Sequence, residues 1–142
     1  MRPTFNIRHP QCMGRIEIDE TVTFGIGVNI DATGNLSIGA HSSVSHKVVI
    51  ITHVHEGSTG PPIGVRPSGR VLAHSLSIGR SVLLGEGAVI MPKVGVIGDW
   101  AVIGAYSVLT KPVGPGEIWA GNPARFVRMR EGMTRQASEL PR

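Results

Sequence analysis

Large apolar side chains recur every six residues along much of the chain. The period begins at Ile18, is reset by two residues before Ile38, resumes at Ile78 after a long interruption, and shifts once more at Ile97. A helix repeats its apolar positions every 3.6 residues and a half-buried strand every two, so neither explains this period. The leading positions of the six-residue units are Ile18, Phe24, Ile30, Ile38, Val44, Ile50, Ile78, Leu84, Ile90, Ile97, Ile103 and Leu109.

Two other positions in each unit follow the same rhythm. Glycine often comes directly after the leading residue, as at Gly39 and Gly85, where the backbone must turn or approach another segment closely. The fifth position is small or β-branched, as at Val48, Ala88 and Ser107. We therefore predict coils of three short parallel strands, stacked ~4.8 Å apart into a triangular prism with the leading residues pointing inward. A β-sandwich with glycine turns would not sustain the six-residue register.

The repeat also predicts how the chain is organised. Residues 1–142 form a single all-β domain, a parallel β-helix of about four coils over 18–51 and 78–114. The register breaks in a long loop over 52–77, and a short tail follows over 115–142. Because loops that leave a regular scaffold often carry function, we expect the functional site at this break.

Two histidines stand where the loop begins. His53 and His55 are two positions apart, so their side chains leave an extended strand on the same side. An imidazole has an ordinary pKa of about 6.5 and can act as a general base near neutral pH. The alternative is a pair of loop histidines in a polar turn. Their position at the break of the repeat favours the functional interpretation.

Composition limits the class of protein. The 142 residues include 19 glycines but only 4% aromatic side chains, so the core of one copy is thin. We therefore expect further burial between copies, in a three-fold oligomer. The longest aliphatic run, Val48 to Ile51, is far shorter than the ~20 residues of a membrane span. The single cysteine, Cys12, permits no intrachain disulfide, which fits the cytoplasm.

Positive charge is concentrated towards the C-terminus. Five arginines and two glutamates from Arg125 onward carry three of the four net positive charges. The segment is either a solvated tail or a site for phosphate groups. No basic stripe with interleaved aromatic residues occurs elsewhere, so we expect no nucleic-acid surface.

Residues 97–128, IGDWAVIGAYSVLTKPVGPGEIWAGNPARFVR, resemble the signature of hexapeptide acyltransferases, in particular galactoside, maltose and polysaccharide O-acetyltransferases. The resemblance extends over about 16–128. It implies a left-handed β-helix and a homotrimer with active sites between subunits. It also implies transfer of an acetyl group from acetyl-CoA to a sugar or polysaccharide hydroxyl, without a metal ion.

The resemblance assigns roles to individual residues. The family's catalytic histidine lies five positions after the leading residue of the interrupted unit, which is His55 here, and His53 is the alternative if the strand end is slipped. This base would take the proton of the acceptor hydroxyl as it attacks the thioester. A backbone N–H near Gly85 and Glu86 of a facing coil would hold the developing oxyanion.

The same resemblance implies a coenzyme site. Backbone groups of Ala105 and Thr110 would bind the pantetheine amides. Lys111, Arg125 and Arg128 would bind the nucleotide phosphates. The alternatives are a lysine in a turn and arginines in a solvated tail.

Some positions depart from the family pattern. Leu83 stands where the family often has tryptophan, and Glu86 stands where a serine is common. The acceptor pocket is matched least. Asn29 and Asp31 lie one coil before the loop and are candidate ligands of sugar hydroxyls, although they would equally cap a turn.

Three other functions remain open at this level. Serine or an amino sugar is a possible acceptor for the same chemistry. A zinc enzyme resembling the hexapeptide carbonic anhydrases would use His41 and His46, with His53 or His74 as the third ligand. A trimeric β-helix without catalytic activity would explain the repeat but not the loop histidines or the basic tail.

Overall fold

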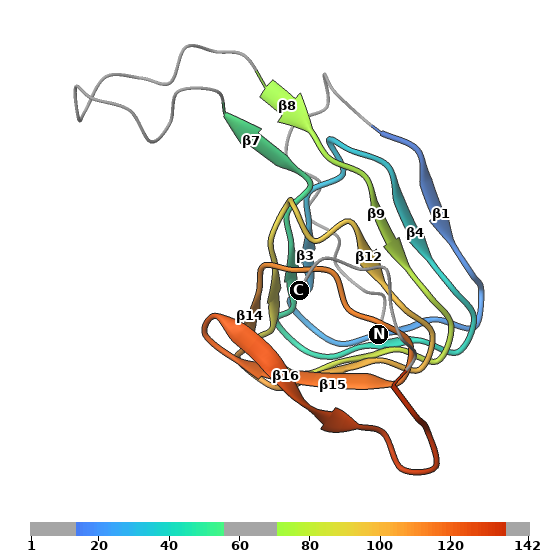
Figure 1. The fold of residues 1–142 in the computed structure, drawn as a ribbon. Coiled ribbons are helices and arrows are strands. Elements are labelled where there is room, and N and C mark those ends of the chain that lie inside the picture. Colours follow the sequence, from blue (N-terminus) through green and yellow to red (C-terminus); the bar gives the residue numbers. More distant parts are fainter. Residues whose placement is uncertain (1–13, 56–70, 136–142) are drawn as a thin grey trace, which may run out of the picture.

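Three parallel sheets close into a three-sided column in the computed structural model, which describes residues 14–55 and 71–135 (Figure 1). We call the sides A, B and C, in the order in which each coil visits them. Side A contains β1 (Ile16–Ile18), β4 (Leu36–Ile38), β9 (Leu76–Ile78) and β12 (Val96–Ile97). Side B contains β2 (Thr23–Phe24), β5 (Ser43–Val44), β10 (Leu83–Leu84) and β13 (Val102–Ile103). Side C contains β3 (Asn29–Ile30), β6 (Val49–Ile50), β11 (Val89–Ile90) and β14 (Val108–Leu109). This architecture confirms the predicted parallel β-helix.

The leading residues pair in register from coil to coil, as the six-residue period predicts. On side B, for example, Leu84 pairs with Val44 of the preceding coil and Ile103 of the next. The same register holds on sides A and C. From Ile30 to Leu109 the leading side chains are at most 2% exposed. Burial of each such aliphatic side chain contributes roughly 1.5–3 kcal/mol, so this inward stack is the main source of stability.

Close approach between coils explains the glycines that follow the leading residues. A Cβ on Gly85 would lie 2.5 Å from the amide nitrogen of Ala105, and one on Gly98 would lie 2.5 Å from the nitrogen of Pro115. Neither glycine has a positive φ. Of the two reasons that the sequence left open, the tight contact between stacked backbones is therefore the operative one at these positions.

The three edges of the column differ in which residues turn the corner. On edge CA, where side C passes to side A, the leading residues are followed by Asp31, Ile51, Met91 and Thr110 rather than by glycine. The long interruption leaves from this edge. Its described ends form an antiparallel pair of β7 (His53–His55) and β8 (Val71–Ala73), seen above the column in Figure 1.

The C-terminal segment closes one end of the column. Strand β15 (Glu117–Gly121) continues side B, and β16 (Ala124–Met129) pairs with it in antiparallel fashion. Trp119 pairs with Ile103 and is 4% exposed, so it extends the inward stack. Its indole nitrogen donates a hydrogen bond of 2.8 Å to the buried carboxylate of Glu117, which also faces Arg135 at 3.7 Å. Much of the predicted tail is therefore folded.

No helix within residues 14–55 and 71–135 has the length and apolar character required to cross a membrane.

The contact between coils predicts the effect of a single methyl group. Gly98→Ala should lower the free energy of unfolding by about 1–3 kcal/mol, because the new Cβ meets backbone that cannot move aside. Ser45→Ala is the matched control, since this leader-following position already carries a Cβ and the change should stay within ~0.5 kcal/mol. Urea denaturation of both variants measures the difference. Equal stability of Gly98→Ala and wild type would contradict the close-approach account.

Candidate active site at the interrupted edge

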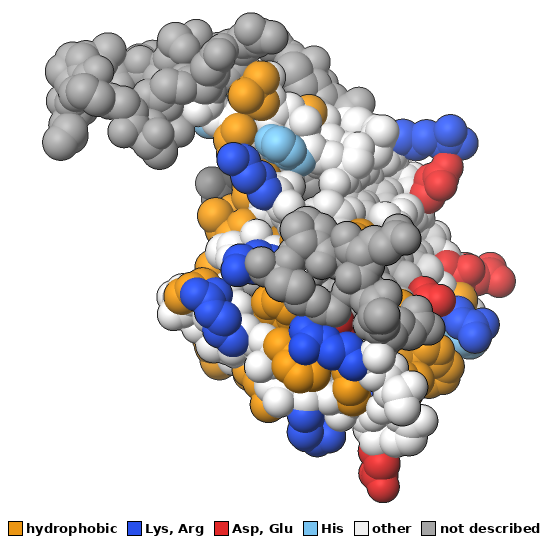
Figure 2. All heavy atoms as spheres, in the orientation of Figure 1, with side chains coloured by type: hydrophobic (Ala, Val, Ile, Leu, Met, Phe, Trp, Pro, Cys, Tyr) orange, Lys and Arg blue, Asp and Glu red, His pale blue; other side chains and the backbone are white. Residues whose placement is uncertain are grey.

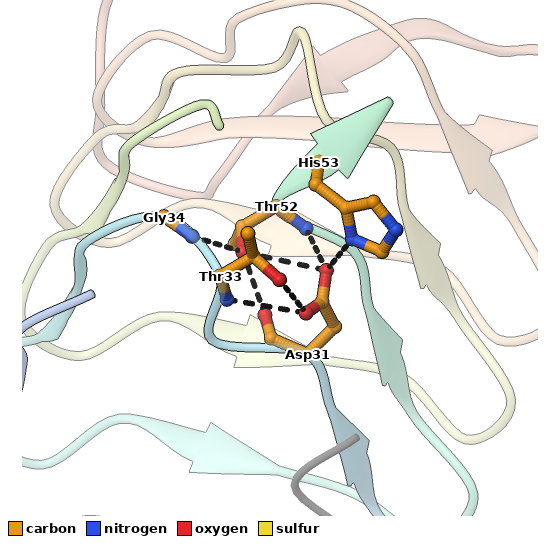
Figure 3. A network of polar contacts seen from close by, with 5 residues as sticks. All are labelled: Asp31, Thr33, Gly34, Thr52 and His53. Carbon is orange, nitrogen blue, oxygen red and sulfur yellow. Dashed lines mark hydrogen bonds and ion pairs between the residues drawn. The ribbon is translucent and has the colours of Figure 1, made fainter. Parts of the chain in front are cut away.

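The carboxylate of Asp31 organises edge CA of the first complete coil (Figure 3). One oxygen accepts hydrogen bonds from the Thr33 amide at 3.1 Å and the Thr33 hydroxyl at 2.6 Å. The other accepts a hydrogen bond of 3.0 Å from the Thr52 amide and contacts Nδ1 of His53. Asp31 therefore joins its own turn to the start of the strand that carries both loop histidines.

Thr52 also stabilises this junction between the Asp31 turn and β7. Its hydroxyl donates to the carbonyl oxygen of Asp31 at 2.8 Å and accepts from the amide of Gly34 at 2.9 Å, and the residue is fully buried. The returning strand packs on this turn, because a Cβ on Gly34 would overlap the carbonyl oxygen of His74. The histidines thus stand on a rigid, hydrogen-bonded base.

Hydrogen bonding keeps Asp31 ionised. Burial alone would raise its pKa, but the hydrogen bonds from Thr33, His53 and Thr52 outweigh burial and hold the pKa below its ordinary value. An ionised Asp31 accepts a hydrogen bond from Nδ1–H of His53. In that tautomer Nε2 of His53 carries the lone pair, so Asp31 fixes both the orientation and the protonation pattern of the ring.

The second histidine lies against the first. The ring centroids of His53 and His55 are 5.0 Å apart, and the ring planes meet at 83°. Both side chains are half-buried on one side of β7, as their spacing predicts. His74 lies at the same junction, where its amide donates to the carbonyl oxygen of Thr52 at 2.7 Å. Its Nε2 is buried without a hydrogen-bond partner among the described residues, a feature that no sequence signal indicated.

The structure gives Asn29 and Asp31 different surroundings. Asn29 lies on the outer face of side C, next to the inward-pointing Ile30, and is half-buried. Both carboxylate oxygens of Asp31 are already bonded, and its contacts with Thr33 and Thr52 are those of a turn cap. The orienting contact with His53 was missed, because sequence spacing does not reveal which coil faces the loop.

The residues expected to bind the oxyanion and the pantetheine arm lie on two edges of side C. Gly85, Glu86 and Ala105 lie on edge BC, where side B passes to side C, whereas Thr110 lies on edge CA with the histidines. The amide of Gly85 donates to the carbonyl oxygen of Ile103 at 2.8 Å and is therefore committed to the coil ladder. Within the described residues, the amides of Glu86 and Ala105 donate no hydrogen bond. The amides of Glu86 and Ala105 are thus available as donors on edge BC, but not beside His53 and His55 of the same chain.

The expected phosphate ligands lie towards the end of the column. Lys111 follows β14 on edge CA, and Arg125 and Arg128 are exposed on β16. Among the residues that the structure describes, the two guanidinium groups donate only to neighbouring carbonyl oxygens, those of Ala124 at 3.3 Å and Met129 at 3.1 Å. Figure 2 shows Lys and Arg side chains gathered over the lower part of one face.

The histidines considered as zinc ligands are spread over three edges. His41 lies on edge AB, where side A passes to side B, and His46 lies on edge BC, where its Nδ1 accepts a hydrogen bond of 2.7 Å from the amide of Ile26. His53 and His74 lie on edge CA. In the described part of the chain, no three His, Cys, Asp or Glu side chains come together as a metal site.

The depressed pKa of Asp31 predicts a pH-dependent stability. The folded carboxyl binds its proton less tightly than the unfolded one, so its stabilising effect is complete at neutral pH and is lost as the pH falls below about 4. Asp31→Asn should lower the free energy of unfolding by about 1–3 kcal/mol at pH 7 and by less at pH 3. Urea denaturation at several pH values measures the gap between the two proteins. A gap that does not change with pH would contradict the assignment.

The chain is similar to known acetyltransferases in sequence and in fold, although no family model matches it. It is 37% identical over 107 residues to galactoside O-acetyltransferase of Escherichia coli K12, which covers 72% of this chain and 52% of the relative. The chain thus spans about half the length of that enzyme.

Solved structures of acetyltransferases have a similar fold. A maltose O-acetyltransferase from Clostridium difficile 630 is 28% identical, with a TM-score of 0.65 over 90% of this chain and 67% of its own. A hexapeptide-repeat acetyltransferase from Vibrio cholerae, solved with acetyl-CoA, is 21% identical, with a TM-score of 0.64 over 91% and 71%. The six-residue repeat, the left-handed parallel β-helix that it builds and these similarities relate the chain to the hexapeptide-repeat acyltransferases.

Proposed function

We propose that the protein is an acetyl-CoA-dependent O-acetyltransferase that acts on a hydroxyl group of a sugar or polysaccharide in the cytoplasm. The observation that carries this proposal is the pair of imidazoles at the interrupted edge, one of them held by the buried carboxylate of Asp31. Two relatives are named for galactoside and maltose as acceptors, and a solved structure of the same fold contains acetyl-CoA. These relatives support both the donor and the acceptor class.

In the proposed reaction His55 is the general base. It takes the proton of the acceptor hydroxyl while the oxygen attacks the thioester carbonyl, and the imidazolium then returns a proton to the departing CoA sulfur. Asp31 orients His53, and the edge-to-face contact between the two rings orients His55 in turn. The alternative base is His53 itself, because its Nδ1 is already held by a carboxylate and its Nε2 carries the lone pair.

A second copy of the chain would complete the site. The histidines lie on edge CA and the unpaired amides of Glu86 and Ala105 lie on edge BC, so side C separates them in one chain. A rotation axis facing side C brings edge CA of one copy beside edge BC of the next. The outer face of side C carries half-buried valines at Val49 and Val89, which suit such an interface. We therefore propose a homotrimer with three shared active sites.

In this arrangement different groups of the protein bind the thioester end and the phosphate end of acetyl-CoA. The amide of Glu86 is the candidate donor to the oxyanion, since the amide of Gly85 is used by the coil ladder. The exposed guanidinium groups of Arg125 and Arg128, with Lys111 on edge CA, are candidate ligands of the coenzyme phosphates. The amides and the basic side chains thus address opposite ends of the coenzyme.

The proposed activity predicts acetyl-CoA consumption with a sugar acceptor. Purified protein should release CoA in the presence of galactosides, maltose or oligosaccharides, measured by a thiol reagent. The panel includes serine and glucosamine, which test the alternative acceptors. Within the same assay, His55→Ala should lower kcat at least ~100-fold while acetyl-CoA affinity changes little, because the base acts only in the chemical step.

His53→Ala and His53→Gln serve as the matched pair in that assay. If His53 only positions His55, the loss should be smaller than in His55→Ala. A complete loss in His53→Ala together with an active His55→Ala would reassign the base. Release of no CoA by the wild type with every acceptor, and no binding of acetyl-CoA, would overturn the proposed function.

The proposed assembly predicts that side C cannot accept a charge. Val89→Glu should convert trimers into monomers and abolish transfer, because an interface does not tolerate an unpaired carboxylate at its centre. Ser77→Glu, on the outer face of side A, is the matched control and should remain trimeric. Light scattering after size-exclusion chromatography gives the mass. A fully active monomeric wild type would contradict the assembly.

A further inference from the structure

Tyr106 holds an unusual backbone conformation at an exposed corner of edge BC. Its φ is 54°, in the left-handed region, where a bulky side chain is strained. Its side chain is 64% exposed, the highest value among the large apolar residues that the structure describes. Burial of the side chain in the core of one chain therefore does not offset the backbone strain at Tyr106.

The same corner position in other coils shows what the turn requires. Gly27, Lys47 and Gly87 occupy it in the preceding coils, with φ of 75°, 59° and 70°. In the coils of Lys47, Gly87 and Tyr106 the amide of this position donates to a carbonyl oxygen of the coil before, at 2.9, 2.9 and 2.7 Å. Trp100 has a positive φ of 65° at a corner of edge AB, but the guanidinium groups of Arg80 and Arg130 lie over its ring. The exposed ring of Tyr106, at a turn that glycine satisfies without strain, therefore calls for another explanation.

The ring of Tyr106 extends parallel to the axis of the column and lies next to Gly87 of the preceding coil. A Cβ on Gly87 would lie 2.5 Å from the ring atom Cδ1, so the ring extends from its own coil over the corner of the preceding one. The bond from the Tyr106 amide to the carbonyl oxygen of Glu86 holds the residue in this place. The ring thus forms a short apolar wall parallel to the axis of the column.

This wall runs beside the two unpaired amides. Ala105 directly precedes Tyr106, and Glu86 is the equivalent residue one coil earlier, so their amides are ~4.8 Å apart along the axis. An extended ligand with hydrogen-bond acceptors along its length would meet both donors and would lie against the ring. The pantetheine arm of acetyl-CoA has this chemistry, with amide groups separated by methylenes and a dimethyl branch.

We infer that Tyr106 is a binding residue for the pantetheine arm of acetyl-CoA, a contact that rests on the proposed function. The amide of Glu86 faces the thioester carbonyl, the amide of Ala105 donates to a polar group of the arm, and the ring of Tyr106 packs against the apolar groups of the arm. The backbone strain at Tyr106 is then offset when the ligand covers the ring. Tyr106 contributes affinity for the arm and none for the nucleotide end of the coenzyme.

The test separates the two ends of the coenzyme. Tyr106→Gly should weaken acetyl-CoA binding to the full-length protein about 5- to 10-fold, measured by titration calorimetry. Binding of adenosine 3′,5′-bisphosphate, which lacks the arm, should not change. Tyr106→Asn, which also adopts a positive φ readily, should show the same selective loss, whereas Tyr106→Phe should retain affinity. Lys47→Gly is the matched control, with the same turn, and should bind both probes like the wild type.

Each outcome has one meaning. A selective loss for acetyl-CoA in Tyr106→Gly and Tyr106→Asn supports the inference. Unchanged acetyl-CoA affinity in both variants overturns it, while the proposed function stands as long as the wild type binds and transfers. An equal loss for both probes also overturns it, because a merely structural role would disturb the whole site. A wild type that binds no acetyl-CoA overturns the proposed function first.

Discussion

The inward stack of aliphatic side chains is the constraint from which the rest of this structure follows. Each coil places one leading residue on each side, and each of these pairs in register with the coils before and after it. A single added or missing residue within a side would turn an inward side chain outward. Insertions and deletions are therefore confined to the edges between sides. The long interruption leaves the column at edge CA, between β6 and β9.

This constraint gives each edge its own chemistry. Close contact between coils leaves no room for a side chain at Gly85 or Gly98, so edges AB and BC offer mainly backbone there. Edge CA carries side chains instead, and Asp31 uses its place to anchor the strand with His53 and His55. Backbone donors and imidazoles are thus separated by the width of one side. In the proposed function two copies of the chain supply both groups, and assembly and catalysis are therefore linked there.

The sequence predicts the column well because the leading residues of the six-residue repeat are the buried residues of the structure. The period that begins at Ile18 gives the register of every side, and Gly85 and Ala88 fall at the close contacts and inward corners that their small size indicates. The location of the candidate site at the break was also predictable, since His53 and His55 stand where the register fails.

Other features depend on which coils face each other, and the sequence does not reveal this. The bond between Asp31 and His53 crosses from one coil to the next, and the buried Nε2 of His74 returns to the same junction from the far end of the loop. The folding of the C-terminal segment was missed because the period shifts again at Val113, which pairs with Ile97; Trp119 follows six residues later and pairs with Ile103. Tyr106 looks like an ordinary turn residue until its φ and the position of its ring are known.

The central claim is that imidazoles from one copy and backbone donors from the next form one site. The most direct measurement is transfer activity in mixed oligomers of two inactive chains. One chain carries His53→Ala and His55→Ala, and the other carries Glu86→Pro, which removes the amide on edge BC that is assigned to the oxyanion. Neither chain should transfer acetyl groups alone, but mixed oligomers should regain activity, because an intact edge CA then meets an intact edge BC. Trimeric mixtures that stay inactive at every ratio would contradict the account.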